Sequence, residues 1–113
     1  MNSRDPLSPA AATEYAVWFR ALAEPMRVRI LNVLACAGRP LRVGEVVAAV
    51  DVGQSTVSEH LKVLATAGFV LVERRGTASL YRANNDCIAA LPAAAEAVMG
   101  AIAPARLEIE RSA

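Results

Sequence analysis

The most reactive side chains in this sequence are two thiols, Cys36 and Cys87, and one imidazole, His60. Two thiols can close a disulfide or polysulfide bridge, or bind a thiophilic metal or metalloid ion. They can equally be small buried hydrophobic side chains. Zinc, nickel and cobalt sites usually combine several imidazole or thiolate ligands, so no cofactor is firmly implied. We therefore predict no metal site. If a metal ion does bind, Cys36 and Cys87 are the alternative ligands.

Enzymatic chemistry has little support. Ser55, Ser58 and His60 fall in one predicted helix, but serine–histidine catalysis also needs an orienting acid and an oxyanion site. No glycine-rich phosphate loop and no pair of catalytic carboxylates can be assembled from the sequence. We expect a protein that is not an enzyme.

A group of short polar side chains lies in the predicted helix 54–67. At about 100° per residue, one face of this helix is apolar, with Val57, Leu61 and Leu64. The opposite face carries Ser55, Glu59 and Lys62, flanked by Thr56 and Ser58. Such a face can enter a major groove, where hydroxyl, amide and ammonium groups reach base edges and phosphates. The first-turn amides of Gln54 and Ser55 could also meet a phosphate. The alternative is a polar surface helix without a special role.

Two arginines follow this helix at the tip of a predicted β-hairpin. The strand-like runs 69–74 and 78–83 flank a turn at residues 75–77, which places Arg74 and Arg75 beside the polar helix. From there a hairpin can reach along the DNA backbone or into the minor groove. Helix and hairpin together indicate DNA binding more specifically than either alone.

The remaining elements complete a winged helix-turn-helix. The pairs Ser8-Pro9 and Glu24-Pro25 indicate helix starts, so we predict helices near 8–23 and 25–37. We also predict a helix at 43–50, a short strand or connector at 41–43, and a last helix over 85–109 that Pro92 breaks or kinks. The helix-turn-helix covers 43–67 and the wing covers 69–83. The fold class is mainly α with a small β-hairpin, as a single domain over 1–113 with additional N- and C-terminal dimerisation helices.

Charge is distributed unevenly. The 113 residues are 55% hydrophobic and carry a net charge of +1, which at first argues against nucleic acid. Residues 20–82, however, hold nine positive and five negative side chains, whereas the two ends hold three positive and six negative. No apolar run approaches the roughly 20 residues of a membrane span, and no export signal is visible, so we expect a cytoplasmic protein with no membrane partner.

Three stretches resemble the ArsR/SmtB family of small dimeric bacterial repressors. They are FRALAEPMRVRILNVL, QSTVSEHLKVLATAGFV and VERRGTASLYRA, and the similarity covers roughly residues 17–83. The family's leucine-alanine-acid-proline-x-arginine box falls at residues 22–27, and its late His-Leu pair falls at 60–61. The resemblance implies a double-stranded DNA operator and an effector that releases the repressor. It also implies a DNA-reading role for Gln54, Ser55, Thr56, Ser58 and His60, and a wing role for Arg74 and Arg75.

The sequence departs from the family at two positions, one directly before the predicted helix 54–67 and one within it. Gly53 stands where a serine is common, which weakens the helix cap. Glu59 places a negative charge on the DNA-facing side. It could accept a hydrogen bond from a cytosine amino group or merely reduce non-specific affinity, and we favour the second.

The family's usual sensor sites are missing from this sequence. The thiolate box of the third helix would need cysteines within 43–50, where there are none. The last-helix metal site would need Asp and His ligands, and only Asp86 and Glu96 are available there. If the strand at Leu41 pairs antiparallel with the strand ending at Ala83, the two cysteines come to the same end of the sheet. A redox or reactive-sulfur switch and a thiophilic metal or metalloid site then remain as alternatives to two inert thiols.

The terminal helices carry apolar stripes that are wide for one small core. We expect a two-fold interface made of Tyr15, Trp18, Phe19, Leu91, Val98, Met99 and Ile102. A homodimer predicts a pseudo-palindromic operator with half-sites about one helical turn apart. The alternatives are that these residues cover their own subunit's core, and that the domain binds a protein rather than DNA.

Overall fold

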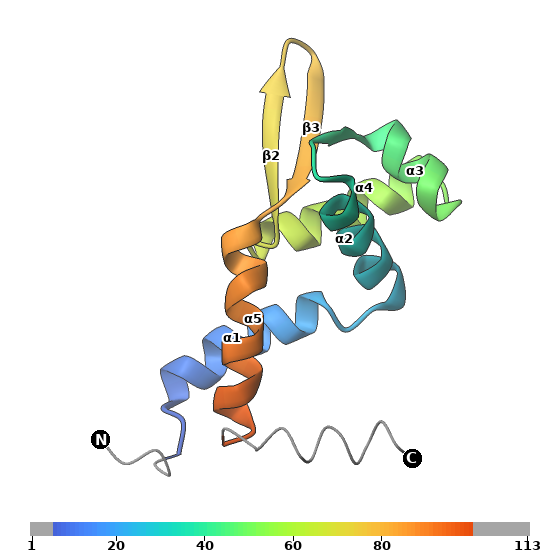
Figure 1. The fold of residues 1–113 in the computed structure, drawn as a ribbon. Helices are drawn as coiled ribbons and strands as arrows, with labels where there is room; N and C mark the ends of the chain where they lie inside the picture. Colours follow the sequence, from blue (N-terminus) through green and yellow to red (C-terminus); the bar gives the residue numbers. More distant parts are fainter. Residues whose placement is uncertain (1–5, 101–113) are drawn as a thin grey trace.

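The structure, a computed structural model, describes residues 6–100 (Figure 1). The elements in chain order are α1 (Pro9–Ala21), α2 (Pro25–Ala37), β1 (Leu41–Arg42), α3 (Val43–Val50), α4 (Gln54–Thr66), β2 (Val70–Arg75), β3 (Ala78–Ala83) and α5 (Asn85–Val98). Helices α2, α3 and α4 pack together, the hairpin projects away from them, and α1 and α5 lie below (Figure 1). This is the predicted winged helix-turn-helix with an additional helix at each end.

Local capping explains where the first two helices begin. The Ser8 hydroxyl accepts from the backbone N–H of Ala11 at 3.1 Å, and Pro9 occupies the first turn. The Glu24 carboxylate accepts from the N–H groups of Met26 and Arg27, at 2.6 and 3.1 Å. Each helix therefore starts at the cap-and-proline pair that the sequence indicates.

The three strands form one antiparallel sheet in the order β1-β3-β2. Leu41 pairs with Tyr81, so the short strand is antiparallel to the second hairpin strand, which meets the condition set for bringing the two cysteines to one end of the sheet. The hairpin register runs from Val70 opposite Ala83 to Arg75 opposite Ala78. Gly76 closes the turn with φ of 62°, a left-handed conformation that favours glycine.

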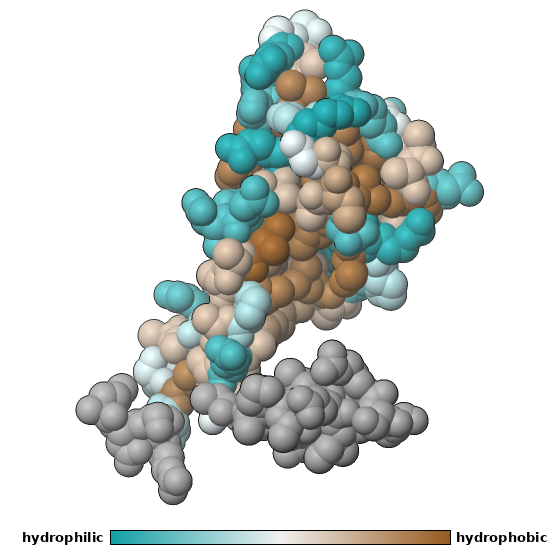
Figure 2. Space-filling model, viewed as in Figure 1, coloured by the Kyte–Doolittle hydropathy of each residue, from teal (hydrophilic) through white to brown (hydrophobic). Residues whose placement is uncertain are grey.

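The core lies where the three middle helices meet the base of the hairpin. Its largest buried side chains are Phe69, Ile30, Leu34, Leu61 and Leu64. Trp18 of α1 packs on Phe69 with ring centroids 6.0 Å apart, which attaches α1 to this core. Figure 2 shows hydrophilic side chains around the projecting hairpin and apolar ones gathered across the middle of the same face.

The structure changes two expectations about the last helix. A break at Pro92 is wrong, because α5 runs without interruption from Asn85 to Val98, whereas a kink there stays a prediction. Leu91 packs on the core and Ala94 is buried, so tertiary contacts on both sides of the proline hold the helix despite the lost N–H. The helix also ends at Val98, and Gly100 follows with φ of 70°. The rest of the predicted range to 109 lies outside the described residues.

Candidate nucleic-acid interface

Helix α4 has one buried face and one exposed polar face. Val57, Leu61 and Leu64 are at most 1% exposed, as the periodicity predicts. Between residues 54 and 62, the exposed side chains are Gln54, Ser55, Thr56, Ser58, Glu59 and Lys62. We call these six residues the reading face. Because the apolar side is fixed against α2 and α3, the reading face is held in one orientation toward solvent.

The turn between α3 and α4 sets the angle at which α4 emerges. Asp51 caps α3 with φ of 59° and donates its N–H to the Val47 carbonyl at 2.9 Å. Gly53 precedes α4 in an extended conformation and offers no side-chain cap. The first-turn N–H groups of α4 therefore lack a side-chain acceptor from Gly53, which leaves them available to a phosphate oxygen.

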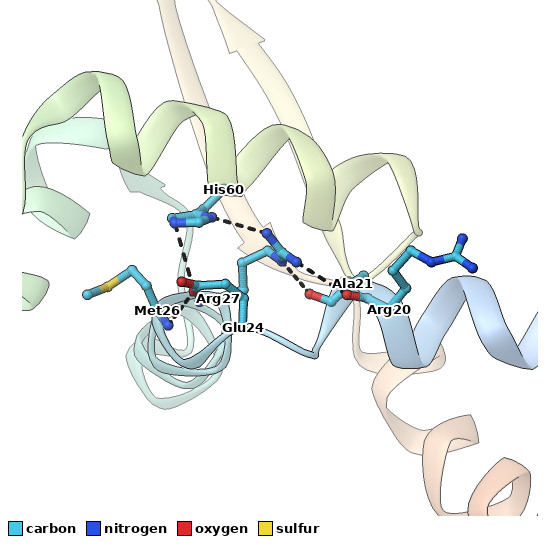
Figure 3. A network of polar contacts seen from close by, with 6 residues as sticks. All are labelled: Arg20, Ala21, Glu24, Met26, Arg27 and His60. Atoms are coloured by element: carbon cyan, nitrogen blue, oxygen red, sulfur yellow. Dashed lines mark hydrogen bonds and ion pairs between the residues drawn. The ribbon is translucent and has the colours of Figure 1, made fainter.

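His60 lies apart from the reading face. Its side chain is 17% exposed and points toward the start of α2 (Figure 3). Nδ1 lies 3.4 Å from Nη1 of Arg27, and Nε2 lies 3.8 Å from the Glu24 carboxylate. Because a guanidinium only donates, Nδ1 accepts in this contact and the ring proton is on Nε2. The resemblance implied base reading by this histidine, whereas the structure brings it to two residues of its own protein.

Arg27 connects α4 to the end of α1. Its Nε donates to the Ala21 carbonyl at 2.6 Å and its Nη2 donates to the Arg20 carbonyl at 3.2 Å (Figure 3). These carbonyls belong to the last turn of α1, where intrahelical donors run out. The arginine therefore caps α1 while its third contact reaches His60. Sequence reasoning missed this role of Arg27, although the six-residue box at 22–27 was a signal that the segment is specialised.

The wing carries its arginines next to the hairpin turn. Arg74 and Arg75 are exposed, and Arg75 is the last residue of β2. Arg74 donates to the Ser79 hydroxyl at 2.8 Å, and Arg75 lies 3.7 Å from the Glu73 carboxylate. Both guanidinium groups keep further donors free for an anion. The packing of α4 on β2 attaches the hairpin to this helix.

The two thiols differ in exposure. Cys36, near the end of α2, is exposed, so the alternative that both cysteines are buried is wrong. The reason is helical phase, because Ile30 and Leu34 take the buried side of α2 and leave Cys36 outside it. Cys87 is half-buried beside Gly68, and this burial raises the pKa of its thiol. Within residues 6–100, no three His, Cys, Asp or Glu side chains cluster as metal ligands do.

The predicted interface residues fall into two groups. Phe19, Val98 and Met99 are exposed, at 38%, 47% and 54%. Trp18 and Leu91 pack partly on their own core, and Tyr15 lies 6.2 Å from Trp18 between ring centroids. Ile102 lies outside the described residues. In this same described part of the chain, no helix is long and apolar enough to cross a membrane.

The fold and its exposed polar helix are those of a winged helix-turn-helix transcriptional regulator. Residues 24–71 match the family model for bacterial regulatory proteins of the arsR family. The uncharacterized HTH-type transcriptional regulator Rv0081 of Mycobacterium tuberculosis is 38% identical over 96 residues, which covers 83% of this chain and 82% of that protein. The chain belongs to the ArsR family.

Two further relatives agree with this assignment. The HTH-type transcriptional regulator NmtR of Mycobacterium tuberculosis is 36% identical over 86 residues, covering 76% of this chain and 70% of that protein. The structure is similar to the homodimeric winged helix-turn-helix DNA-binding domain of Mb0332 from Mycobacterium bovis, with a TM-score of 0.67 and 28% identity. That similarity covers 88% of this chain and 90% of the other.

Proposed function

We propose that this chain is a dimeric repressor that binds a pseudo-palindromic operator and leaves it when an effector binds. The observation that carries the proposal is the reading face of α4, exposed in one orientation beside an arginine-tipped wing. Because that face carries hydroxyls, an amide and a lysine, it can reach base edges and phosphates in a major groove. A repressor of bacterial DNA works in the cytoplasm, and we propose this location.

The proposed roles divide between specificity and affinity. Gln54, Ser55, Thr56 and Ser58 read or approach bases, whereas Lys62, Arg74 and Arg75 neutralise phosphates. Glu59 reduces affinity for all sequences alike. His60 contributes through Arg27 and Glu24, because its ring is turned toward them, and any contact with DNA comes from its remaining exposed edge.

We propose the dimer on the exposed apolar residues of α1 and α5. Phe19, Val98 and Met99 present large hydrophobic surface to solvent in one copy, and a two-fold pairing would bury it. The similar Mb0332 domain is homodimeric, which supports this arrangement. Light scattering at micromolar concentration should give twice the mass of one chain, and a monomer would contradict the dimer.

We propose that the effector acts on the two cysteines. Cys36 is open to reagents and Cys87 is partly so, which supports a redox or reactive-sulfur switch over buried inert thiols. A thiophilic metal or metalloid is the alternative, and one relative, from Bacillus subtilis, is named an arsenical resistance operon repressor. Substituting both cysteines by serine should abolish release by either class of effector and leave DNA binding intact.

DNA binding is tested by fluorescence anisotropy, with labelled DNA from the region upstream of the protein's own gene. Arg75→Ala at the wing tip should reduce the slope of log affinity against log salt by about 0.9 per copy, the value for one lost phosphate contact. Arg82→Ala is the matched control, because Arg82 lies opposite Leu71 at the other end of the same hairpin. Binding that ignores ionic strength would favour the protein-interaction module instead.

A further inference from the structure

An open groove of about 400 Å³ runs between α1 and α4. Its apolar lining residues are Val17 and Ala21 of α1, Val63 of α4, and Ala67 at the C-cap of α4. Its polar lining residues are Arg20, Glu59, Lys62 and Thr66. Small-molecule sites in proteins have this composition and begin at roughly 300 Å³. The groove touches the reading face directly, because Glu59 and Lys62 belong to both.

The groove is separate from the apolar stripe proposed for the dimer. Val17 and Ala21 lie four residues apart on one side of α1, whereas Phe19 points about 160–200° away from them at about 100° per residue. Val17 is 44% exposed and Val63 is 38% exposed, so both offer apolar surface to a ligand. A dimer formed through Phe19 therefore uses the side of α1 opposite to the groove.

The charged side chains at the groove favour a ligand with a negative charge. Arg20 and Lys62 contribute two cations and Glu59 one carboxylate, which leaves one positive charge uncompensated. In the part of the chain that the structure describes, neither Arg20 nor Lys62 is in an ion pair. One carboxylate on a ligand would balance the groove and could be held by the fork of Arg20.

We propose that this groove binds amphipathic monocarboxylates, with the apolar body on Val17 and Val63 and the carboxylate on Arg20 and Lys62. The inference rests on the proposed function, because it identifies a class of effector for the same repressor. A bound carboxylate takes Lys62 away from phosphate and adds a negative charge beside the reading face. The ligand therefore weakens DNA binding through direct electrostatics and without a thiol.

Octanoate tests the site itself in a titration of the full chain followed by amide NMR shifts. We expect saturable binding with a Kd of about 1 mM or below, and shifts gathered at residues 17–21 and 59–67. Octanol and octyltrimethylammonium have the same chain without the carboxylate, and should bind at least about tenfold more weakly, since one charge-assisted contact is lost. Equal binding of octanol would overturn the proposed ligand class.

Matched variants test whether octanoate binds in the groove or elsewhere on the surface. Val17→Asp should weaken octanoate at least about tenfold, because it places a carboxylate on the apolar floor. Val28→Asp is its control, since Val28 is also exposed, at 50%, on helix α2. Arg20→Gln should lower affinity for octanoate but not for octanol, with Arg82→Gln as its control. Unchanged octanoate binding by Val17→Asp would refute the site.

DNA affinity is measured separately, so that the two proposals fail in different ways. Saturating octanoate should weaken DNA binding by at least about tenfold in the unaltered protein and leave Val17→Asp unaffected. Octanoate bound in the groove with unchanged DNA affinity would overturn the effector role. A protein that binds octanoate here but no DNA at all would refute the proposed function and leave the carboxylate site standing.

Discussion

Replacing Arg27 with alanine should destabilise the protein more than replacing Arg29, the other arginine of α2. The change removes the cap on α1, with the 2.6 Å bond to the Ala21 carbonyl and the 3.2 Å bond to the Arg20 carbonyl. It also removes the 3.4 Å contact to His60. Arginine and alanine have similar helix propensities, so the loss reports these contacts rather than the stability of α2 itself.

The magnitude follows from the bond geometry. A bond from a charged donor to a part-buried carbonyl is worth about 1.5–3 kcal/mol. The exposed bond to Arg20 adds about 0.5 kcal/mol, and the long contact to His60 adds little. Arg27→Ala should therefore lower the free energy of unfolding by about 2–3.5 kcal/mol. Arg27→Lys should recover only part of this, because one ammonium cannot serve all three acceptors.

Urea unfolding at one fixed protein concentration measures the loss, since a dimer's stability depends on concentration. Arg29→Ala is the control. Arg29 is exposed on the same helix and makes a single 3.4 Å bond to the Val50 carbonyl, so its loss should cost about 0.5 kcal/mol. If Arg27→Ala were no more destabilising than Arg29→Ala, the capping role assigned to Arg27 would be refuted.

Three further outcomes are expected. Phe69→Ala should cost about 3–5 kcal/mol in urea unfolding, because Phe69 is fully buried under Trp18, and a cost below about 1 kcal/mol would show that the core is misassigned. Iodoacetamide should modify Cys36 faster than Cys87 by mass spectrometry, since burial raises the pKa of the Cys87 thiol, and the reverse order would contradict the structure. The hydrogen bond from Arg39 lowers the pKa of Glu45, so Glu45→Gln should lower the unfolding midpoint at pH 7. That difference should shrink as pH falls below about 4.3, the ordinary glutamate value, and a difference that persists at pH 2 would exclude this cause.

The sequence predicts well those features that depend on local periodicity. The buried side of α4 followed from the spacing of Val57, Leu61 and Leu64, and the hairpin followed from two apolar runs around Gly76. The starts of α1 and α2 followed from their cap-and-proline pairs. Each of these signals is contained within about fifteen residues, so no knowledge of the tertiary arrangement is needed.

Features that join distant segments were missed. The contact between Arg27 and His60 spans 33 positions, and nothing in the spacing of either residue indicates the other. Trp18 was assigned to a subunit interface, and the structure packs it partly on Phe69, because a helix face alone does not say which apolar surface it meets. The continuity of α5 through Pro92 likewise depends on packing that a local rule cannot include.

The sheet order has a consequence for the behaviour of variants in solution. Among residues 6–100, β3 is the central strand and β2 is an edge strand, with Val72 47% exposed and no strand paired along its outer side. Edge strands of this kind can pair with copies of themselves, and charged side chains prevent it. Glu73, Arg74 and Arg75 supply those charges, so the arginines proposed for DNA also keep the hairpin from aggregating. Removing both at once should produce insoluble protein, and single substitutions are therefore the informative ones.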